Sequence, residues 1–345
     1  MLTRGEGRSL EIFLALRSLK LAFLGGFHAF PGGGVAKVDR QVEVANPSEG
    51  LPAHIVSCAA RELLEECGVV IAGKLAGKPA DIAAARTQLL ASEAVWPEMV
   101  RRGDITLDAR AFNTFGRWVT PPFGQLRFDA QYLQLDAAKL EPSIWPGELD
   151  EGMWLTPQSA LASHDAGNIF ISYPVLETIR TIRAAHNDLP TAARAMEARG
   201  VNPPSGGEML TGVHVLPLKS PTLPPATHTN VYTLGHHDVV IVDPAPTEAE
   251  PQEELIHYLT RLQASGVRLR EIWLTHHHPD HVGSAMLVRD RFGIPIAAHE
   301  ITASDLHGIV KVDRFIADGE VSRMPLIGDH FAEWTAIFTP GHARG

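Results

Sequence analysis

The segment CAARELLEECGVV at residues 58–70 most constrains the fold, because it joins strong helix formers to a dense group of charges. Alanine, leucine and glutamate favour a helix, and Gly68 stands where a left-handed residue ends one. The pattern predicts a helix at 54–67. At about 100° per residue its apolar side chains form one broad arc, with Glu62 and Glu66 on the edge of that arc. These two carboxylates are therefore expected to be partly buried.

Burying unpaired carboxylates is costly, so Glu62, Glu65 and Glu66 require a nearby cation. Arg61 is one such cation, and a bound divalent metal is the other. All-oxygen ligands suit Mg²⁺ or Mn²⁺ better than Zn²⁺. The alternative is a solvated acidic helix, which explains the overlap of carboxylates and apolar arc less well.

RELLEECGV, residues 61–69, resembles the second half of the Nudix signature at every fixed position. FPGGG at 30–34 supplies the glycines of the first half, and Asp39 stands at the place of its glutamate. Fifteen residues, 41–55, then intervene, which departs from the signature. The resemblance implies that Glu62, Glu65 and Glu66 hold Mg²⁺ or Mn²⁺ and activate water against a diphosphate, while Arg61 orients them.

The segment FLALRSLKLAFLGGFHAFPGGG, residues 13–34, is similar to the motif of coenzyme A pyrophosphohydrolases. Arg17, Ser18, Gly26 and residues 30–33 match its spacing, whereas Ala22 replaces a second arginine. Residues 117–134 are similar to the branch that contains the peroxisomal coenzyme A diphosphatase. The resemblance implies a small-molecule diphosphate of the coenzyme A type, bound with the help of Arg17, Gly32 and Gly33. The alternative for Arg17 is a surface arginine at a strand end.

The first 198 residues mix strands with helices, as expected of a Nudix α/β/α sandwich. ELDEGMWLTPQSAL, residues 148–161, looks like the closing segment of that fold, in which Glu148 or Glu151 is either the general base or a surface charge. Strands are predicted at 10–17, 28–30, 106–119 and 127–135, and helices at 54–67, 79–91, 156–163 and 172–198. Pro190 is expected to break the last helix.

RGVNPPSGGEML, residues 199–210, interrupts this pattern with two prolines and three glycines, as a linker between domains does. The predicted domains are 1–198 and 211–345. In the second, residues 227–246 read as two apolar strands joined by a Gly-His-His-Asp turn, and residues 270–285 as a strand followed by a histidine-rich loop.

The spacing His276-x-His278-x-Asp280-His281 is the strongest zinc signal in the chain. In an extended segment His276 and His278 point to the same side, and a turn at Pro279 brings Asp280 and His281 toward a second metal position. His277 is expected to point away.

This stretch resembles the metal motif of metallo-β-lactamase-fold hydrolases such as glyoxalase II. Asp243 falls at the place of that family's structural aspartate, and His342 at the place of its next histidine ligand. The resemblance implies an incomplete αβ/βα fold, because the family continues into a second lobe beyond the position of Gly345. We therefore expect an uncovered inner sheet face, and a fragment or a domain completed by another chain.

Composition bears on partners and compartment. The 345 residues carry a net charge of −10, which disfavours general nucleic-acid binding. The two cysteines, Cys58 and Cys67, are nine residues apart on one predicted helix, so reduced thiols and a cytoplasmic setting are expected. No apolar run is long enough to span a membrane. The helix predicted at 172–198 packs on its own domain or on a partner, which leaves a homodimer open.

The sequence thus predicts a metal-dependent hydrolase of a nucleoside diphosphate derivative, coenzyme A or an acyl-coenzyme A, joined to half of a zinc hydrolase. Two alternatives remain. In one, the main function is a zinc-dependent thioesterase-like or nuclease-like activity with an accessory Nudix domain. In the other, the chain is a non-catalytic metal-binding scaffold.

Overall fold

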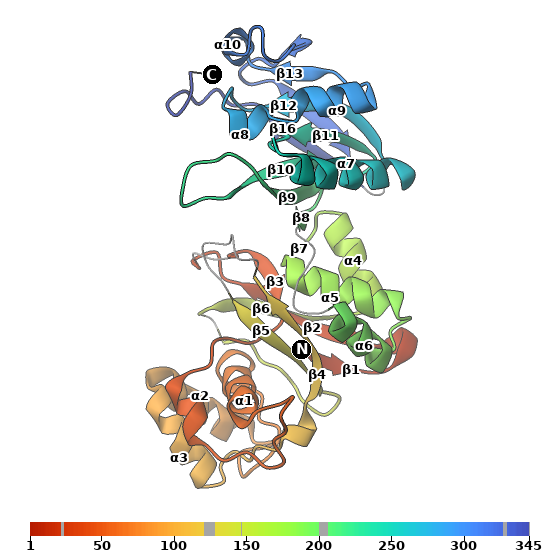
Figure 1. Ribbon diagram of the computed structural model, residues 1–345. Coiled ribbons are helices and arrows are strands. Elements are labelled where there is room, and N and C mark those ends of the chain that lie inside the picture. Colours follow the sequence, from red (N-terminus) through yellow and green to blue (C-terminus); the bar gives the residue numbers. More distant parts are fainter. Residues whose placement is uncertain (22–23, 121–127, 146, 200–205, 327–329, 345) are drawn as a thin grey trace. The chain divides into compact units, whose positions relative to one another are not determined.

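A computed structural model describes residues 1–21, 24–120, 128–145, 147–199, 206–326 and 330–344. Packing divides them into two compact units, each with its own sheet (Figure 1). The first contains Met1–Thr120, Phe128–Ser163 and the chain from Ile169 to Arg199; the second contains His164–Asn168 and the chain from residue 206 onward. Ala22 and half of the predicted linker, residues 200–205, lie outside the described residues, so the linker stays a prediction.

The first unit is built on a mixed sheet in the order β4-β5-β1-β2-β3-β7, with β6 also paired to β2. Its strands are β1 (Leu2–Arg4), β2 (Glu11–Arg17), β3 (Phe27–Ala29), β4 (Asn113–Val119), β5 (Asp129–Asp136), β6 (Leu149–Leu155) and β7 (Phe170–Ile171). Its helices are α1 (Ala53–Cys67), α2 (Pro79–Ala91), α3 (Trp96–Arg101), α4 (Pro157–Asp165), α5 (Tyr173–Ala184) and α6 (Leu189–Arg199). Short 3-10 helices are η1 (Gly7–Ser9), η2 (Lys37–Gln41), η3 (Glu93–Val95) and η4 (Ala109–Ala111).

Alternation along β2 gives this sheet two buried faces. Phe13 and Ala15 belong to the core that includes α1, α2 and α3, whereas Ile12 and Leu14 belong to the core that includes α4, α5 and α6. Figure 1 shows these two groups of helices on opposite sides of the sheet. The predicted α/β/α sandwich is confirmed.

Helix α1 agrees with its prediction to within one residue. Gly68 ends it at φ 60°, in the left-handed region, and its N–H donates to the carbonyl of Leu64. Cys58 and Cys67 of α1 are both buried and are not joined by a disulfide.

Two predicted elements are wrong in extent. The strand predicted at 106–119 begins only at Asn113, because residues 107–109 bond to Ala45 and then form η4. The helix predicted at 172–198 is two helices, α5 and α6, separated where His186 and Asn187 adopt positive φ. Pro190 lies in the first turn of α6, where its missing N–H costs nothing, so the break precedes it.

The second unit has a sheet in the order β14-β13-β12-β11-β10-β9-β8 and a separate β15-β16 hairpin. Its strands are β8 (Gly207–Leu210), β9 (Val213–Lys219), β10 (His228–Leu234), β11 (Asp238–Val242), β12 (Arg268–Leu274), β13 (Ile296–Ala298), β14 (Arg314–Phe315), β15 (Val321–Pro325) and β16 (Phe331–Thr335). Its helices are α7 (Ala249–Ala264), α8 (Pro279–Val282), α9 (Ala285–Phe292) and α10 (Glu300–Asp305).

One face of this second sheet is closed by helices, since Val239 and Ile241 of β11 share a core with Leu255 and Leu259 of α7. On the other face Val240 is buried with Met324 of the hairpin. The expectation of an uncovered inner face is therefore wrong in part, because the β15-β16 hairpin of this chain packs there. Among the described residues, no helix is both long and apolar enough to cross a membrane.

Candidate metal centres

The first centre is organised around a buried arginine on α1. Arg61 is 2% exposed, and its guanidinium donates to both carboxylate oxygens of Asp39 at 3.1 Å. It also donates to Glu65 at 2.9 Å and forms an ion pair with Glu62 at 2.9 Å. Asp39 is fully buried and further accepts from the hydroxyl of Ser57. The aspartate at the place of the Nudix glutamate is thus the anchor of the arginine that was predicted to orient the cluster.

Two glycines that precede α1 lie directly against carboxylates of that helix. The N–H of Gly32 donates to Glu66 at 2.7 Å. A Cβ added at Gly33 would lie 2.5 to 2.7 Å from the carboxylate atoms of Glu62. Both were predicted to bind substrate; in the structure each lies against a glutamate of α1, and a role in binding substrate stays a prediction.

Burial dominates the electrostatics of the three glutamates. It raises the pKa of Glu65 to about 7, against the opposing charge of Arg61. It raises the pKa of Glu66 to about 8, where the Gly32 hydrogen bond opposes the shift and the neighbouring Glu62 and Glu148 add to it. The pKa of Glu62 is also raised by burial, again against Arg61. Excess negative charge collects here, which is the condition that a bound cation relieves.

Glu148 and Glu151 are now distinguished by their surroundings. Glu148 is one of the charges that raise the pKa of both Glu62 and Glu66, whereas Glu151, on β6, acts on His28 instead. Arg17, at the end of β2, is among the groups that lower the pKa of Glu66. Glu148 and Arg17 therefore both act electrostatically on Glu66.

The glutamates do not form a closed ligand shell by themselves. Among the described residues, the ligand groups whose donor atoms all lie within 4.8 Å of one another contain no member of Glu62, Glu65 and Glu66. Glu65 faces Arg61 and the charge of Glu93. Their side chains offer only oxygen donors, the type that Mg²⁺ and Mn²⁺ prefer, and binding of either metal here stays a prediction.

Arg86 on α2 was missed by the sequence reasoning. Its guanidinium donates to the backbone carbonyls of Glu65 and Glu66 at 2.6 Å each, and to that of Ser143 at 3.0 Å. A cation at the C-terminal end of a helix satisfies its last carbonyls and its dipole. The spacing along the chain carries no signal for this contact, which depends on how α2 packs on α1.

The second centre is a cluster of histidines where β12 ends and α8 begins. Donor atoms of His276, His278 and His342 lie within 4.8 Å of one another. The Nε2 of His276 is 3.1 Å from the Nδ1 of His278, and the ring of His342 lies 4.6 Å from that of His278. The predicted three-histidine set is thus brought together by the fold.

Asp243 supports the second centre from the end of β11. It adopts φ 50°, accepts from the backbone N–H and the hydroxyl of Thr275 at 2.8 and 2.6 Å, and lies 2.8 Å from Nδ1 of His281. Asp243, His276 and His281 form another group within 4.8 Å, so the two groups share His276. The arrangement offers two neighbouring positions for metal.

The histidine pKa values differ with surroundings. Burial and the neighbouring imidazoles lower the pKa of His276 to about 4, which keeps its nitrogens available as neutral donors at pH 7. For His281, burial is outweighed by the hydrogen bond and charge of Asp243, and its pKa is raised. Imidazole nitrogens together with one carboxylate are a donor set that Zn²⁺ uses in proteins.

The other residues considered in this region belong to neither of the two groups. Asp280 lies 3.9 Å from Nε2 of His281 but belongs to neither group of three. His277 points to Asp305, away from both groups, as the alternation predicted. His299 accepts from the N–H of Ile301 at the start of α10 and stacks on Phe338. It is a structural histidine.

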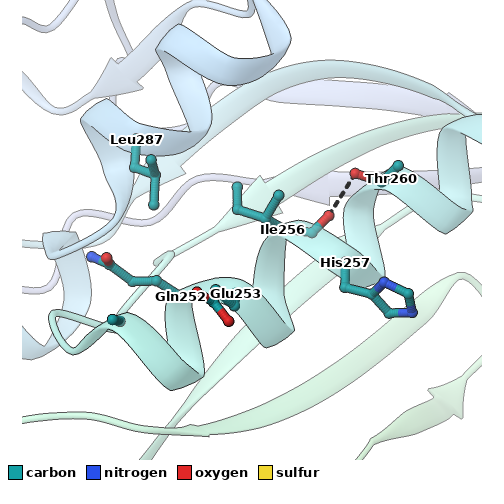
Figure 2. A pocket seen from close by; sticks show the side chains of 7 residues that line it. Gln252, Glu253, Ile256, His257, Thr260 and Leu287 are labelled. Atoms are coloured by element: carbon teal, nitrogen blue, oxygen red, sulfur yellow. Dashed lines mark hydrogen bonds between the residues drawn. The ribbon is translucent and has the colours of Figure 1, made fainter.

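A surface hollow of the second unit is separate from this cluster. Figure 2 shows it on α7, with Leu287 of α9 opposite. It is lined by Ala249, Gln252, Glu253, Ile256, His257, Thr260 and Leu287. None of these residues belongs to the histidine cluster.

Comparisons with known proteins match parts of this chain. Residues 224–344 match the model of the metallo-β-lactamase superfamily. The chain is 37% identical over 122 residues to a hydroxyacylglutathione hydrolase of Thermosynechococcus vestitus, covering 34% of this chain and 42% of that protein. It is 39% identical over 105 residues to the hydroxyacylglutathione hydrolase of a Synechococcus strain, covering 30% and 35%. The chain spans less than half the length of these relatives.

Among solved structures, a Nudix hydrolase from Alicyclobacillus acidocaldarius is similar with 24% identity and a TM-score of 0.45, covering 59% of this chain and 96% of that one. The matched family model contains Asp243, His276, His278, His281 and His342 within its range. Residues 224–344 are therefore a metallo-β-lactamase superfamily domain.

Proposed function

We propose that this chain is a hydrolase with two metal centres, a Nudix centre for a diphosphate bond and a zinc centre for an ester or thioester bond. Each unit has its own core, the first unit carries the carboxylates around Arg61 and the second the histidine cluster, which supports separate activities. The two centres rest on different observations and are tested separately.

The observation that carries the Nudix centre is the buried Asp39–Arg61 pair that holds Glu62 and Glu65. Glu62 and Glu66 would hold Mg²⁺ or Mn²⁺, which when bound neutralises phosphate charge and stabilises the leaving oxygen. Glu148 would accept a proton from the attacking water, because its charge acts on both of these carboxylates. Arg17 would bind phosphate oxygens at the end of β2. A coenzyme A-type diphosphate is the proposed substrate because of the motif at residues 13–34.

The experiment is product analysis with the full chain. Coenzyme A, ADP-ribose and NADH are each incubated with Mg²⁺ or Mn²⁺, for the wild type, for Glu66→Gln, and for Glu197→Gln as a control at an exposed glutamate of α6. Cleavage of coenzyme A to 3′,5′-ADP by the wild type and the control, and not by Glu66→Gln, is expected. A folded, metal-binding wild type that cleaves no diphosphate overturns this half of the proposal.

The zinc centre is carried by the cluster of His276, His278 and His342 beside Asp243 and His281. These residues would hold Zn²⁺, which when bound would supply Lewis-acid chemistry toward a carbonyl or phosphoryl group. Asp243 would fix the orientation and tautomer of His281 through the contact at Nδ1, so that Nε2 of His281 would be its donor atom for metal. The similarity of this domain to hydroxyacylglutathione hydrolases favours a thioester as its substrate.

The test is hydrolysis of a hydroxyacylglutathione thioester and of an acyl-coenzyme A by the zinc-loaded chain. His278→Ala should abolish hydrolysis, while His257→Ala, at an exposed histidine of α7, should leave it unchanged. Equal rates in the two variants would contradict the assignment. A phosphodiester is assayed alongside as the competing substrate class.

A further inference from the structure

A second group of ligand-type side chains lies in the same unit, away from the histidine cluster. Strands β8 and β9 pair antiparallel, with Glu208 directly opposite His214. His236 lies in the turn between β10 and β11. The two turns are joined by a hydrogen bond from the N–H of Gly235 to the carbonyl of Gly212 at 2.8 Å. The strand register therefore brings one carboxylate and two imidazoles to one end of the sheet.

The three side chains converge on one buried oxygen. The Oε1 of Glu208 lies 2.6 Å from Nε2 of His236 and 3.9 Å from Nε2 of His214. All three ligand atoms lie within 4.8 Å of one another. The side chain of Glu208 is 2% exposed, that of His236 8% and that of His214 28%.

We propose that Glu208, His214 and His236 bind one Zn²⁺-class divalent cation, distinct from the centre at His276. Two imidazoles and one carboxylate form a donor set that zinc uses in proteins. In a tetrahedral site with bonds of about 2.0 to 2.1 Å, ligand atoms lie about 3.3 Å apart, and the separations of 2.6 and 3.9 Å bracket that value. Side-chain shifts below about 1 Å would complete the geometry.

Glu208 is buried and already contacts Gly212, His236 and, at 3.9 Å, Nε2 of His164, and a bound cation would further offset the cost of burying its charge. The N–H of Gly212 donates to Glu208 at 2.8 Å and fixes its orientation, as a supporting hydrogen bond does for a metal ligand. His214 is the most exposed of the three, so the position left for a fourth ligand opens toward solvent. Metal bound here ties the β8–β9 turn to the β10–β11 turn and stabilises this end of the sheet.

Metal content of the full chain tests the proposal. After zinc loading and dialysis, His214→Ala should hold about one equivalent less zinc per chain than the wild type, and Glu208→Gln should show the same loss. His257→Ala should match the wild type. Equal zinc content in the wild type and His214→Ala overturns the proposal and leaves a hydrogen-bonded histidine–carboxylate pair. His214 is half-buried, so its truncation is compatible with folding.

A second measurement does not depend on those variants. The chain carrying both His276→Ala and His278→Ala lacks the zinc centre of the histidine cluster. Added Co²⁺ should still produce visible absorption typical of a tetrahedral nitrogen and oxygen site. The absence of this absorption in the folded chain equally overturns the proposal. Loss of thioesterase activity with retained absorption shows that the two centres are separate.

Discussion

Arg61 is the residue on which the first centre most depends, because one guanidinium holds three carboxylates and the carbonyl of Gly34. Its planar fork matches Asp39 through two nitrogens, which a lysine cannot reproduce. Removing one partner of a buried pair leaves the other charge uncompensated.

Asp39→Asn is therefore expected to lower the free energy of unfolding by about 3 kcal/mol. Glu98→Gln, which removes the exposed ion pair with Arg101, should cost less than about 1 kcal/mol. Denaturant unfolding of the first unit, followed by its tryptophan fluorescence, measures both. Similar losses for the two variants would contradict the role of Asp39 as the anchor.

Gly33→Ala tests whether the approach of Glu62 to the glycine run matters for chemistry. The added methyl group displaces the carboxylate of Glu62, and a displacement of about 1 Å can reduce turnover by about 100-fold. Thermal stability should change little, because the carboxylate is the end of a flexible side chain. Gly34→Ala is the matched control, since nothing lies within 4 Å of the added atom. The kcat for diphosphate cleavage should be lower in Gly33→Ala than in Gly34→Ala. Equal values would contradict a role for the approach of Glu62 to Gly33.

At the scale of elements, the stability of α1 is expected to depend on pH through Glu65 and Glu66. Burial raises the pKa of Glu65 to about 7 and that of Glu66 to about 8, both from an ordinary value of 4.5. A carboxyl whose folded-state pKa is raised contributes stability that is fully present below about pH 4.5 and is lost as the pH rises through 7 to 8. Without metal, α1 should therefore become less protected as the pH rises over this window.

Hydrogen exchange of the α1 amides between pH 5 and 9, corrected for intrinsic rates, measures this loss in the presence of a chelator. Mn²⁺ should restore protection mainly above pH 7, where the glutamates are ionised. Glu66→Gln should flatten the pH dependence. Protection that rises with pH in the metal-free chain would run against the assigned pKa directions.

At the scale of the whole molecule, two cores that share no residue support two separable activities. Glu66→Gln is expected to abolish diphosphate cleavage and leave thioester hydrolysis unchanged, and His278→Ala to do the reverse. Both activities are assayed on each full-length variant. Loss of both in either variant would show that the centres depend on each other.

How far the sequence predicts the structure varies with the range of the interaction. Local geometry predicts that α1 ends at Gly68 and that His276 and His278 lie on the same side of the chain. Both features are found. The break between α5 and α6 was attributed to Pro190, yet it falls earlier, where His186 and Asn187 adopt positive φ. The sequence did not predict that β15-β16 covers one face of the sheet, because the packing partner of a hairpin depends on contacts with residues far away in the chain.

The sequence by itself determined the helix that carries the glutamates, the histidine spacing and the alternation that buries both faces of β2, because each depends on residues near one another in the chain. Only the tertiary structure decided that Asp39 anchors Arg61, that Arg86 holds the end of α1, and that Glu208 meets His214 and His236. The physical reason is that these contacts join separate elements, and strand register and helix packing fix them through the whole core.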